Sequence, residues 1–246
     1  MASETAAFAA TGYMTPPDLL AAPPPWKLTG DGWVVFYKFS PDDPRGVVER
    51  DELNAHWRGG TGAVAWMNYR SSPVGAYSEL LYIPGKFEVL RRGKLKKLYS
   101  ISQSYVSTWE SVIGGRTNWG IPKDHADFVV ETLPDGEDHL SASLDGTQIA
   151  GLTASAGLFR MPVNTGLFPV TVVQRWQGRS FFIKLAVSAG IEWLTSIKVT
   201  GDGVHIPDLS DIKPLGAIKL DRFKITFPTP VIESADAPEA AETRRN

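Results

Sequence analysis

The chain has 246 residues with 25 basic and 27 acidic side chains, so its net charge is −2 and no general affinity for nucleic acid or anionic membranes is expected. Hydrophobic residues make up 43% of the chain and charged residues 21%, a balance typical of a soluble domain with a well-packed core. The chain contains no cysteine, which excludes disulfides, thiolate nucleophiles and cysteine-ligated metals.

The two ends of the chain differ in composition from the part between them. Residues 1–25 are rich in alanine, threonine and proline, and we expect an N-terminal extension with one or two helical turns at Pro16–Ala22 before an extended lead-in. Residues 233–246 lack apolar bulk, which predicts a disordered tail. Nothing between these ends requires two domains, so residues 26–232 are predicted to form a single one.

Short apolar and β-branched runs, separated by turn residues about every ten positions, dominate this central part. The predicted strands are Trp33–Phe39, Ala63–Tyr69, Tyr77–Ile83, Tyr99–Trp109, Phe128–Thr132, Leu140–Leu144, Gln148–Ala154, Val170–Trp176, Ser180–Val187, Glu192–Thr200 and Ala217–Phe227. Turns are expected at Gly30-Asp31-Gly32 and at Pro134-Asp135-Gly136, and the basic run 91–97 is read as a solvated hairpin turn around Gly93. So many short strands indicate a barrel or sandwich.

Helices are few in this pattern. Val47–His56 has roughly helical spacing of its apolar residues. Ser107 and Glu110 have the spacing of a capping box, which predicts a short helix through Arg116 that ends at the Gly114-Gly115 pair. The fold class is therefore mostly β with few short helices (α+β), and Lys123 is expected just past the second helix, on the next strand.

Lys123 follows Pro122 and has Trp119, Ile121 and Phe128 nearby in sequence. An apolar environment favours the neutral amine, the form that attacks carbonyl groups, because desolvation penalises the ammonium form. Spacing alone favours the other interpretation, a surface lysine at a strand end. Glu79 has the same two interpretations: a buried acid or base that moves a proton, or a solvent-facing strand residue.

A resemblance to a known family favours the functional interpretations. Gly115-Arg116, followed after five residues by Pro122-Lys123, resembles the Gly-Arg…Pro-Lys-Lys segment of the acetoacetate decarboxylase superfamily, whose first lysine forms a Schiff base. Tyr77-Ser78-Glu79 resembles the Tyr-x-Glu element of that family, and residues 215–231 resemble its closing strands. The resemblance covers roughly residues 26–232 and implies a β-cone or barrel that encloses an apolar pocket, in a homo-oligomer.

The chain departs from the family pattern at the positions that would tune the lysine and bind a carboxylate. The second lysine of the motif is Asp124 here, expected on the opposite face of the strand, where solvent would weaken its effect on the amine. The substrate arginine of the family would fall near Asp31 or Gly32. These departures favour a larger and more apolar carbonyl substrate than acetoacetate.

Further residues are candidates for the same site. Arg116, Trp119, Tyr77, Trp66 and His125 are predicted to bind the substrate, with His125 on the same strand face as Lys123. Arg116 has an alternative structural role, holding Glu79 or Glu110 or capping the helix end. The four histidines show no metal-binding spacing, so neither a metal nor another cofactor is expected.

Three functions are compatible with these residues. The first is a lyase-type enzyme, for example of secondary metabolism, that activates a β-keto acid or another carbonyl compound as an imine of Lys123. The activated compound would then undergo decarboxylation, dehydration or cyclisation. The second is a noncovalent cyclase, isomerase or dehydratase in which protonated Lys123 polarises a carbonyl. The third is a non-catalytic binder of a hydrophobic small molecule. The beginning of the chain lacks a signal-peptide pattern and no window is apolar enough to span a membrane, so a cytoplasmic protein is expected.

Overall fold

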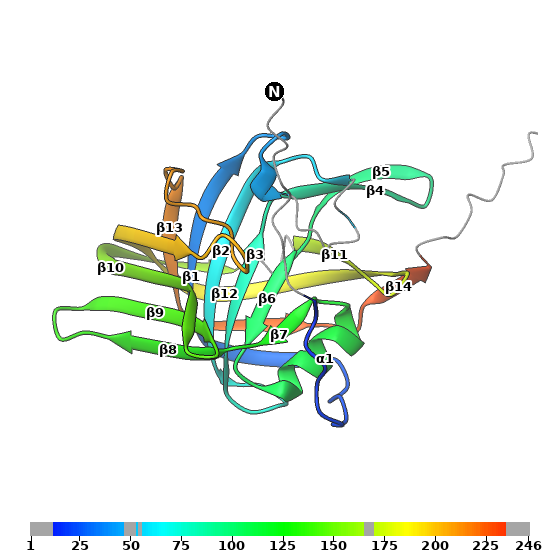
Figure 1. Cartoon of the computed structure of the whole chain (residues 1–246), viewed down its shortest axis with the longest axis horizontal. Helices are drawn as coiled ribbons and strands as arrows, with labels where there is room; N and C mark the ends of the chain where they lie inside the picture. Colours follow the sequence, from blue (N-terminus) through cyan, green and yellow to red (C-terminus); the bar gives the residue numbers. More distant parts are fainter. Residues whose placement is uncertain (1–11, 47–52, 54–55, 165–169, 235–246) are drawn as a thin grey trace, which may run out of the picture.

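The computed structural model describes residues 12–46, 53, 56–164 and 170–234, and most of these residues lie in one branched β-sheet that carries the helix α1 (Figure 1). The elements are β1 (Trp26–Phe39), the 3-10 helix η1 (Pro44–Gly46), β2 (Gly60–Ser71), β3 (Tyr77–Ile83), β4 (Lys86–Arg91), β5 (Lys94–Tyr99), β6 (Gln103–Val106), α1 (Trp109–Trp119), β7 (Lys123–His125), β8 (Asp127–Thr132), β9 (Glu137–Leu144), β10 (Thr147–Asn164), β11 (Val170–Trp176), β12 (Arg179–Gly201), β13 (Gly216–Phe227) and β14 (Val231–Ser234).

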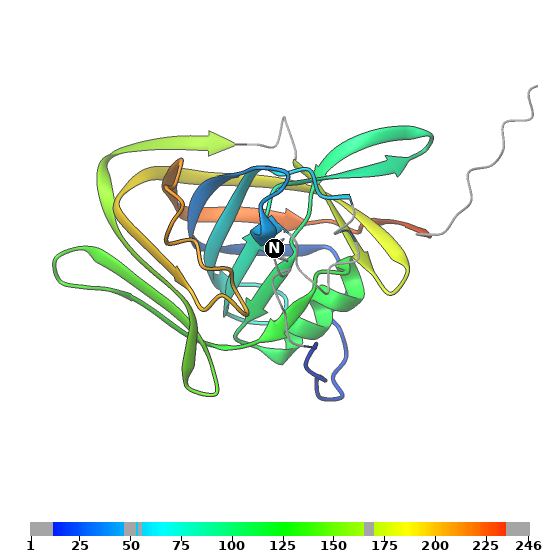
Figure 2. The same ribbon diagram turned by 45° about the horizontal axis from the view of Figure 1, so that its top comes forward.

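The strands follow the order β4-β5-β11-β12-β13-β1-β2-β3-β6-β7, and β8, β9, β10 and β14 branch from this path. All pairs are antiparallel except β5 with β11 and β6 with β7. The strands curve around the molecule (Figure 2), but within the described residues no pairing joins β4 to β7, so the sheet is open. The mostly β fold is confirmed, and in the part of the chain that the structure describes its curved strands do not close into a ring.

The longest strand, β12, connects the parts of the sheet. Its first half pairs with β11 and β14, and its second half pairs with β10. Over Ala186–Trp193 it pairs with β13, on the edge opposite β10. The sequence predicts two strands here, Ser180–Val187 and Glu192–Thr200. The structure instead has one continuous strand, with an irregularity in the pairing between Ser188 and Gly190.

Side chains alternate between two apolar clusters on opposite faces of the sheet. The first contains Trp33, Trp66 and Tyr105, and the connection between β12 and β13 adds Ile206 and Leu209 to it. The second contains Trp26, Met67, Tyr69, Tyr77 and Trp119, the last of these from α1. The helix therefore covers the second face of the sheet.

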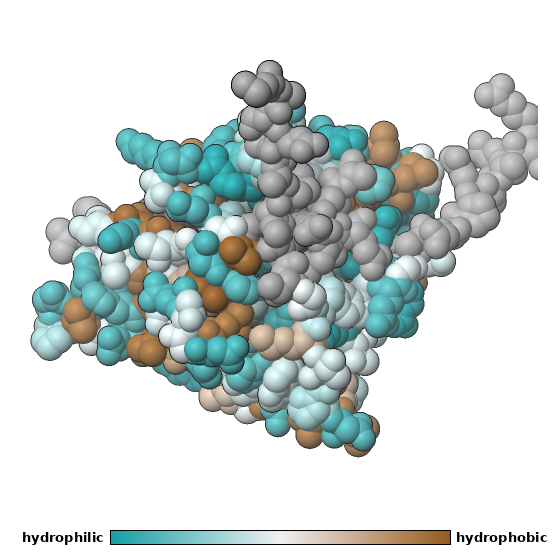
Figure 3. All heavy atoms as spheres, viewed as in Figure 1, coloured by the Kyte–Doolittle hydropathy of each residue, from teal (hydrophilic) through white to brown (hydrophobic). Residues whose placement is uncertain are grey.

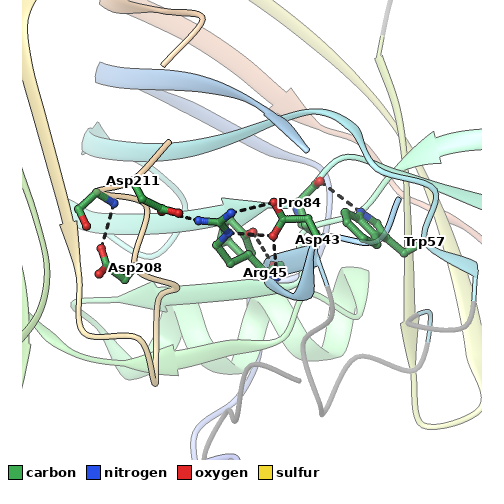
Figure 4. Close-up of polar contacts among 8 residues, drawn as sticks. Asp43, Arg45, Trp57, Pro84, Asp208 and Asp211 are labelled. Carbon is green, nitrogen blue, oxygen red and sulfur yellow. Dashed lines mark hydrogen bonds and ion pairs between the residues drawn. The ribbon is translucent and has the colours of Figure 1, made fainter. Parts of the chain in front are cut away.

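Polar contacts fasten the connection between β12 and β13 to the rest of the fold (Figure 4). Arg45 of η1 lies between two carboxylates, with its Nε 2.8 Å from Asp43 Oδ1 and its Nη1 2.5 Å from Asp211 Oδ1. The hydroxyl of Tyr82 donates to the Arg45 carbonyl over 2.6 Å. Through Arg45, these bonds link the connection to η1 and to Tyr82 of β3.

The hairpin of β4 and β5 projects from the rest of the sheet, with its turn at Arg92-Gly93 as predicted. Leu90 and Leu95 on this hairpin are exposed, and Figure 3 shows apolar atoms at the corner where the hairpin lies in Figure 1. The turn at residues 134–136 between β8 and β9 is also confirmed.

Three local predictions are wrong. Residues 16–22 contain no helical turn, because Pro16-Pro17 and the prolines at 23–25 leave few backbone donors for one. Gly30-Asp31-Gly32 is an irregularity inside β1 rather than a turn before it. The strand predicted for Tyr99–Trp109 is interrupted: β5 ends at Tyr99, β6 covers Gln103–Val106, and Trp109 begins α1.

The helix α1 also differs from the prediction. Its N-cap is Thr108 with no side-chain capping bond, and the Ser107 hydroxyl instead accepts a bond from the Ser78 amide. The helix passes through Gly114 and Gly115 and ends at Gly120, which has the left-handed conformation with φ 65°. The helix predicted at Val47–His56 lies almost wholly outside the described residues. The first two residues of the predicted disordered tail, Glu233 and Ser234, belong to β14, and the rest of that tail lies outside the described residues.

Candidate functional site

Lys123 begins β7, which follows directly after α1, as predicted. The Gly120 turn and Ile121-Pro122 carry the chain from the helix back to the sheet, where Lys123 lies opposite Ser104 in the parallel pairing of β7 with β6. The residue is only 4% exposed. Its side chain therefore lies in the interior, on the face of the sheet that α1 covers.

Lys123 and Glu79 form a buried ion pair. The lysine Nζ lies 2.7 Å from Glu79 Oε1, and the two side chains are 5% and 2% exposed. Glu79 reaches this position from β3 because it alternates with Leu80, which packs in the other cluster. Glu79 is therefore buried rather than facing solvent, as the other interpretation would have it.

Hydroxyl groups complete the surroundings of the pair. Tyr69 donates to Glu79 Oε2 over 2.7 Å, and Ser104 donates to Glu79 Oε1 over 2.9 Å. Lys123 Nζ donates to the hydroxyl of Ser111 on α1 over 3.2 Å. Both charges thus have hydrogen-bond partners, which is what makes a buried ion pair tolerable.

Gly115 leaves room for the side chain of Lys123 to pass α1. A methyl group at this position would lie 2.5 Å from Lys123 Cδ and 2.8 Å from its Cε. The stem of the lysine therefore crosses α1 where the helix has no side chain. Gly114 serves a different neighbour, since a methyl group there would lie 2.4 Å from the ring of Trp26.

Tyr77 lies beside the amine. Lys123 Nζ is 5.3 Å from the centre of the Tyr77 ring, within the range of a cation–π contact. The Tyr77 ring also packs against that of Tyr69, with 4.5 Å between centroids. The cluster is thus aromatic on one side and hydroxyl-rich on the other.

Asp124 points to the other side of β7, as predicted, but it is not solvated. Its side chain is 3% exposed and forms an ion pair with Arg116, so an arginine rather than water balances its charge. Arg116 also donates through Nε to the Lys123 carbonyl over 2.7 Å. These contacts place the guanidinium of Arg116 behind β7 rather than beside Lys123 Nζ. They are structural, as the alternative expected, but the acidic partner is Asp124, which that alternative did not name.

The other candidates are dispersed. His125 stacks on Trp109 at the start of α1, with 4.9 Å between ring centroids. Trp119 packs against Trp26, and its Nε1 donates to the Pro228 carbonyl. Trp66 lies in the first apolar cluster, across the sheet from Glu79, so it is not brought together with Lys123. Contact of His125 and Trp119 with a substrate stays a prediction.

Tyr69, Ser104 and Ser111 were missed by the sequence reasoning. Ser111 precedes Gly115 by four positions, so a face of small residues on the predicted helix was a readable signal. Tyr69 and Ser104 carried no such signal, because their proximity depends on the pairing of β3 with β2 and β6.

A hollow of about 290 Å³ lies elsewhere on the molecule, over β8, β9, β10 and β12. Its lining includes His139, Gly151 and Lys198 and none of the residues around Lys123. A substrate pocket at Lys123 therefore stays a prediction. Among the described residues no three histidine or acidic side chains could together hold a metal ion, and no helix there has the length and apolarity to cross a membrane.

The buried tyrosines predict a loss of stability in alkali. Burial, and then the Glu79 charge, raise the pKa of Tyr69 and Tyr77 well above the usual value, and burial does the same to the pKa of Tyr82. In the unfolded chain tyrosine ionises near pH ~10. The stabilisation is therefore complete below about pH 10 and decreases above it, by about 1.4 kcal/mol per pH unit for each such tyrosine.

Urea unfolding between pH 8 and 11.5 tests this expectation. The unfolding free energy should be flat at the lower end and fall above about pH 10, and Tyr82→Phe, remote from Lys123, should reduce the slope of that fall. An equal slope in the variant would contradict the expectation.

The family model for acetoacetate decarboxylase matches residues 10–164, more than half of the chain. No curated protein matches the chain in sequence. Among solved structures, acetoacetate decarboxylase from Legionella pneumophila is similar with a TM-score of 0.65 at 15% identity, over 90% of this chain and 92% of that one.

Two further structures have the same fold. The enduracididine biosynthesis enzyme MppR in complex with pyruvate has a TM-score of 0.61 at 15% identity, over 87% of this chain and 92% of that one. An acetoacetate decarboxylase-like enzyme from Sphingomonas wittichii RW1 has a TM-score of 0.55 at 15% identity, over 92% and 99% of the two chains. At this level of identity the similarity shows the fold alone.

Proposed function

Because this chain belongs to the acetoacetate decarboxylase family, we propose that it is an enzyme that activates a carbonyl compound, such as a β-keto acid, through the amine of Lys123. The observation that carries the proposal is the buried contact of 2.7 Å between Lys123 Nζ and Glu79 Oε1. A lysine amine with an acid–base partner at hydrogen-bond distance is the arrangement that Schiff-base chemistry needs.

The pair can move the protons of this reaction. Glu79 accepts one proton from the ammonium of Lys123, which leaves a neutral amine. The nitrogen then attacks the carbonyl carbon, a C–N bond forms, and the carbonyl oxygen departs as water after it has received two protons, leaving an imine. The imine nitrogen draws electrons from the adjacent carbon, which allows a neighbouring C–C bond to break or form.

The surroundings of the pair also suit substrates larger than a small keto acid. Asp124 stands where the family motif has a second lysine, and its charge is taken up by Arg116. Tyr69 and Tyr77 present aromatic rings instead. MppR, which shares the fold, has been seen with the condensation product of pyruvate and imidazole 4-carboxaldehyde. We therefore extend the proposal to condensation, dehydration or cyclisation of a larger carbonyl compound.

A noncovalent reaction is the second candidate. Lys123 Nζ contacts an acid, a hydroxyl and the face of an aromatic ring, all of which suit an ammonium group. In this mechanism the ammonium donates a hydrogen bond to the substrate carbonyl, and Glu79 removes a proton from the carbon next to it.

Trapping with sodium cyanoborohydride separates the two candidates. Incubation with pyruvate or acetoacetate should give a reduced adduct that peptide mass spectrometry locates on Lys123. Lys123→Arg should abolish the adduct, since arginine keeps the charge but forms no imine, whereas Lys94→Arg on the exposed part of β5 should leave it unchanged. Turnover of any carbonyl substrate by Lys123→Arg would contradict the covalent mechanism.

A further inference from the structure

The N-terminal strap, residues 12–25, runs beside α1 and ends where β1 begins (Figures 1 and 2). One attachment is at Ala22, whose carbonyl accepts a hydrogen bond of 2.7 Å from Asn118 Nδ2 on the helix and one of 3.0 Å from Trp26 Nε1. The strap is therefore held to the outer side of α1 near its C-terminal end.

A second attachment reaches β7. The Met14 amide donates to Asp124 Oδ1 over 3.0 Å, and the Met14 carbonyl accepts from Arg116 Nη1 over 2.8 Å. The ring of Tyr13 packs edge-on against Trp176 with 4.6 Å between centroids, and the Arg116 guanidinium lies 5.3 Å from the centre of the Tyr13 ring. Backbone and aromatic contacts thus converge on one arginine.

The same arginine holds the backbone of the reactive lysine. Its Nε donates to the Lys123 carbonyl over 2.7 Å, and another of its nitrogens pairs with Asp124, the next residue along the chain. Arg116 is 11% exposed and Asp124 3%. The contact between strap and β7 is therefore a nearly dry ion pair, in which polar bonds are stronger than in water.

Within the described residues the short strand β7 pairs with one other strand. It contains three residues and pairs in parallel with β6 at the end of the sheet. Its position decides where the stem of Lys123 starts, and therefore how Nζ meets Glu79. Contacts on the outer side of β7 are placed to fix that distance.

We propose that Tyr13, Met14, Asp124 and Arg116 are positioning residues: by docking on the outer side of β7, the strap holds Lys123 Nζ against Glu79. This inference rests on the proposed function of Lys123. The proposal also explains Asp124. Its carboxylate does not contact the Lys123 amine but binds the strap and Arg116 on the opposite side of β7.

Full-length variants test the proposal from both sides of the contact. Tyr13→Ala weakens the attachment of the strap without altering the sequence of β7. Leu20→Ala is the matched control, because Leu20 lies in the same segment and is 97% exposed. Asp124→Asn weakens the contact from β7, with Asp127→Asn at an exposed position as its control. Two quantities are measured: the rate of cyanoborohydride trapping of pyruvate on Lys123, and amide hydrogen exchange over residues 121–125.

We expect both Tyr13→Ala and Asp124→Asn to slow trapping about tenfold and to accelerate exchange at residues 121–125, while both controls behave as the unaltered protein. Tyr13→Phe should restore the trapping rate, because it keeps the ring. Faster exchange with unchanged trapping would overturn the proposal, since the strap would then have a structural role alone. Unchanged exchange would also overturn it.

Failure of the proposed function itself is distinguishable. If the unaltered protein forms no adduct on Lys123, imine chemistry with these probes is excluded. The exchange of residues 121–125 in Tyr13→Ala then decides separately whether the strap holds β7.

Discussion

Replacing Lys123 by methionine is expected to destabilise the fold strongly, by about 3–5 kcal/mol, because it leaves Glu79 as a buried charge without its partner. Methionine matches the length and apolar stem of lysine, so packing against Gly115 is kept and the loss reports the charge. The measurement is the free energy of unfolding from urea titration at pH 7.

The double variant Lys123→Met, Glu79→Gln should recover most of that loss, since the amide can still accept from Tyr69 and donate to the Ser104 hydroxyl. Arg58→Met is the matched control, because Arg58 and Glu88 form a pair with side chains 44% and 26% exposed; it should cost about 1 kcal/mol or less. A small loss in Lys123→Met, with no recovery in the double variant, would contradict the buried ion pair.

Alanine at Gly115 is expected to reduce activity far more than stability. Its methyl group would lie 2.5 Å from Lys123 Cδ, so the flexible stem must move and Nζ leaves its position beside Glu79. A displacement of about 1 Å costs on the order of a hundredfold in rate. Alanine is also a better helix former than glycine by about 1 kcal/mol, which offsets part of the strain.

Gly114→Ala provides the comparison on the same helix. Its methyl group meets the ring of Trp26, which is buried and cannot swing aside, so we expect a loss of stability of about 1–3 kcal/mol. Lys123 should still be trapped by pyruvate in the folded protein. Thermal unfolding and trapping, measured on both variants, give the test: equal losses of trapping in the two would show that Gly115 has no special relation to the lysine.

The fold could be read from the sequence where the signal was local. The alternation of apolar residues located β3 and β11 at the observed bounds, and the turns at Gly93 and at residues 134–136 are where their glycines predicted them. The Gly114-Gly115 pair predicts a helix end, and this prediction is wrong. The helix continues through both glycines. The ring of Trp26 packs where a side chain at position 114 would lie, and the stem of Lys123 packs where one at position 115 would lie. Tertiary packing overrode local propensity.

The residues of the site show the same contrast between local signals and long-range packing. Lys123, Glu79 and Tyr77 followed from a motif and from strand alternation, and the structure brings them together. Ser104 and Tyr69 depend on which strands are neighbours, which one sequence does not reveal. The buried state of Asp124 was missed because its partner Arg116 comes from the preceding helix and the strap covers both.

The two ion pairs on either side of β7 have a consequence for folding. Lys123 faces an acid and Asp124 faces a base, so a slip of this strand by one residue would turn Asp124 towards Glu79 and Lys123 towards Arg116. Both opposite-charge contacts would become like-charge contacts in a dry interior, at a high electrostatic cost. Two adjacent residues of opposite charge thus favour the observed alignment of a three-residue strand over an alignment shifted by one residue.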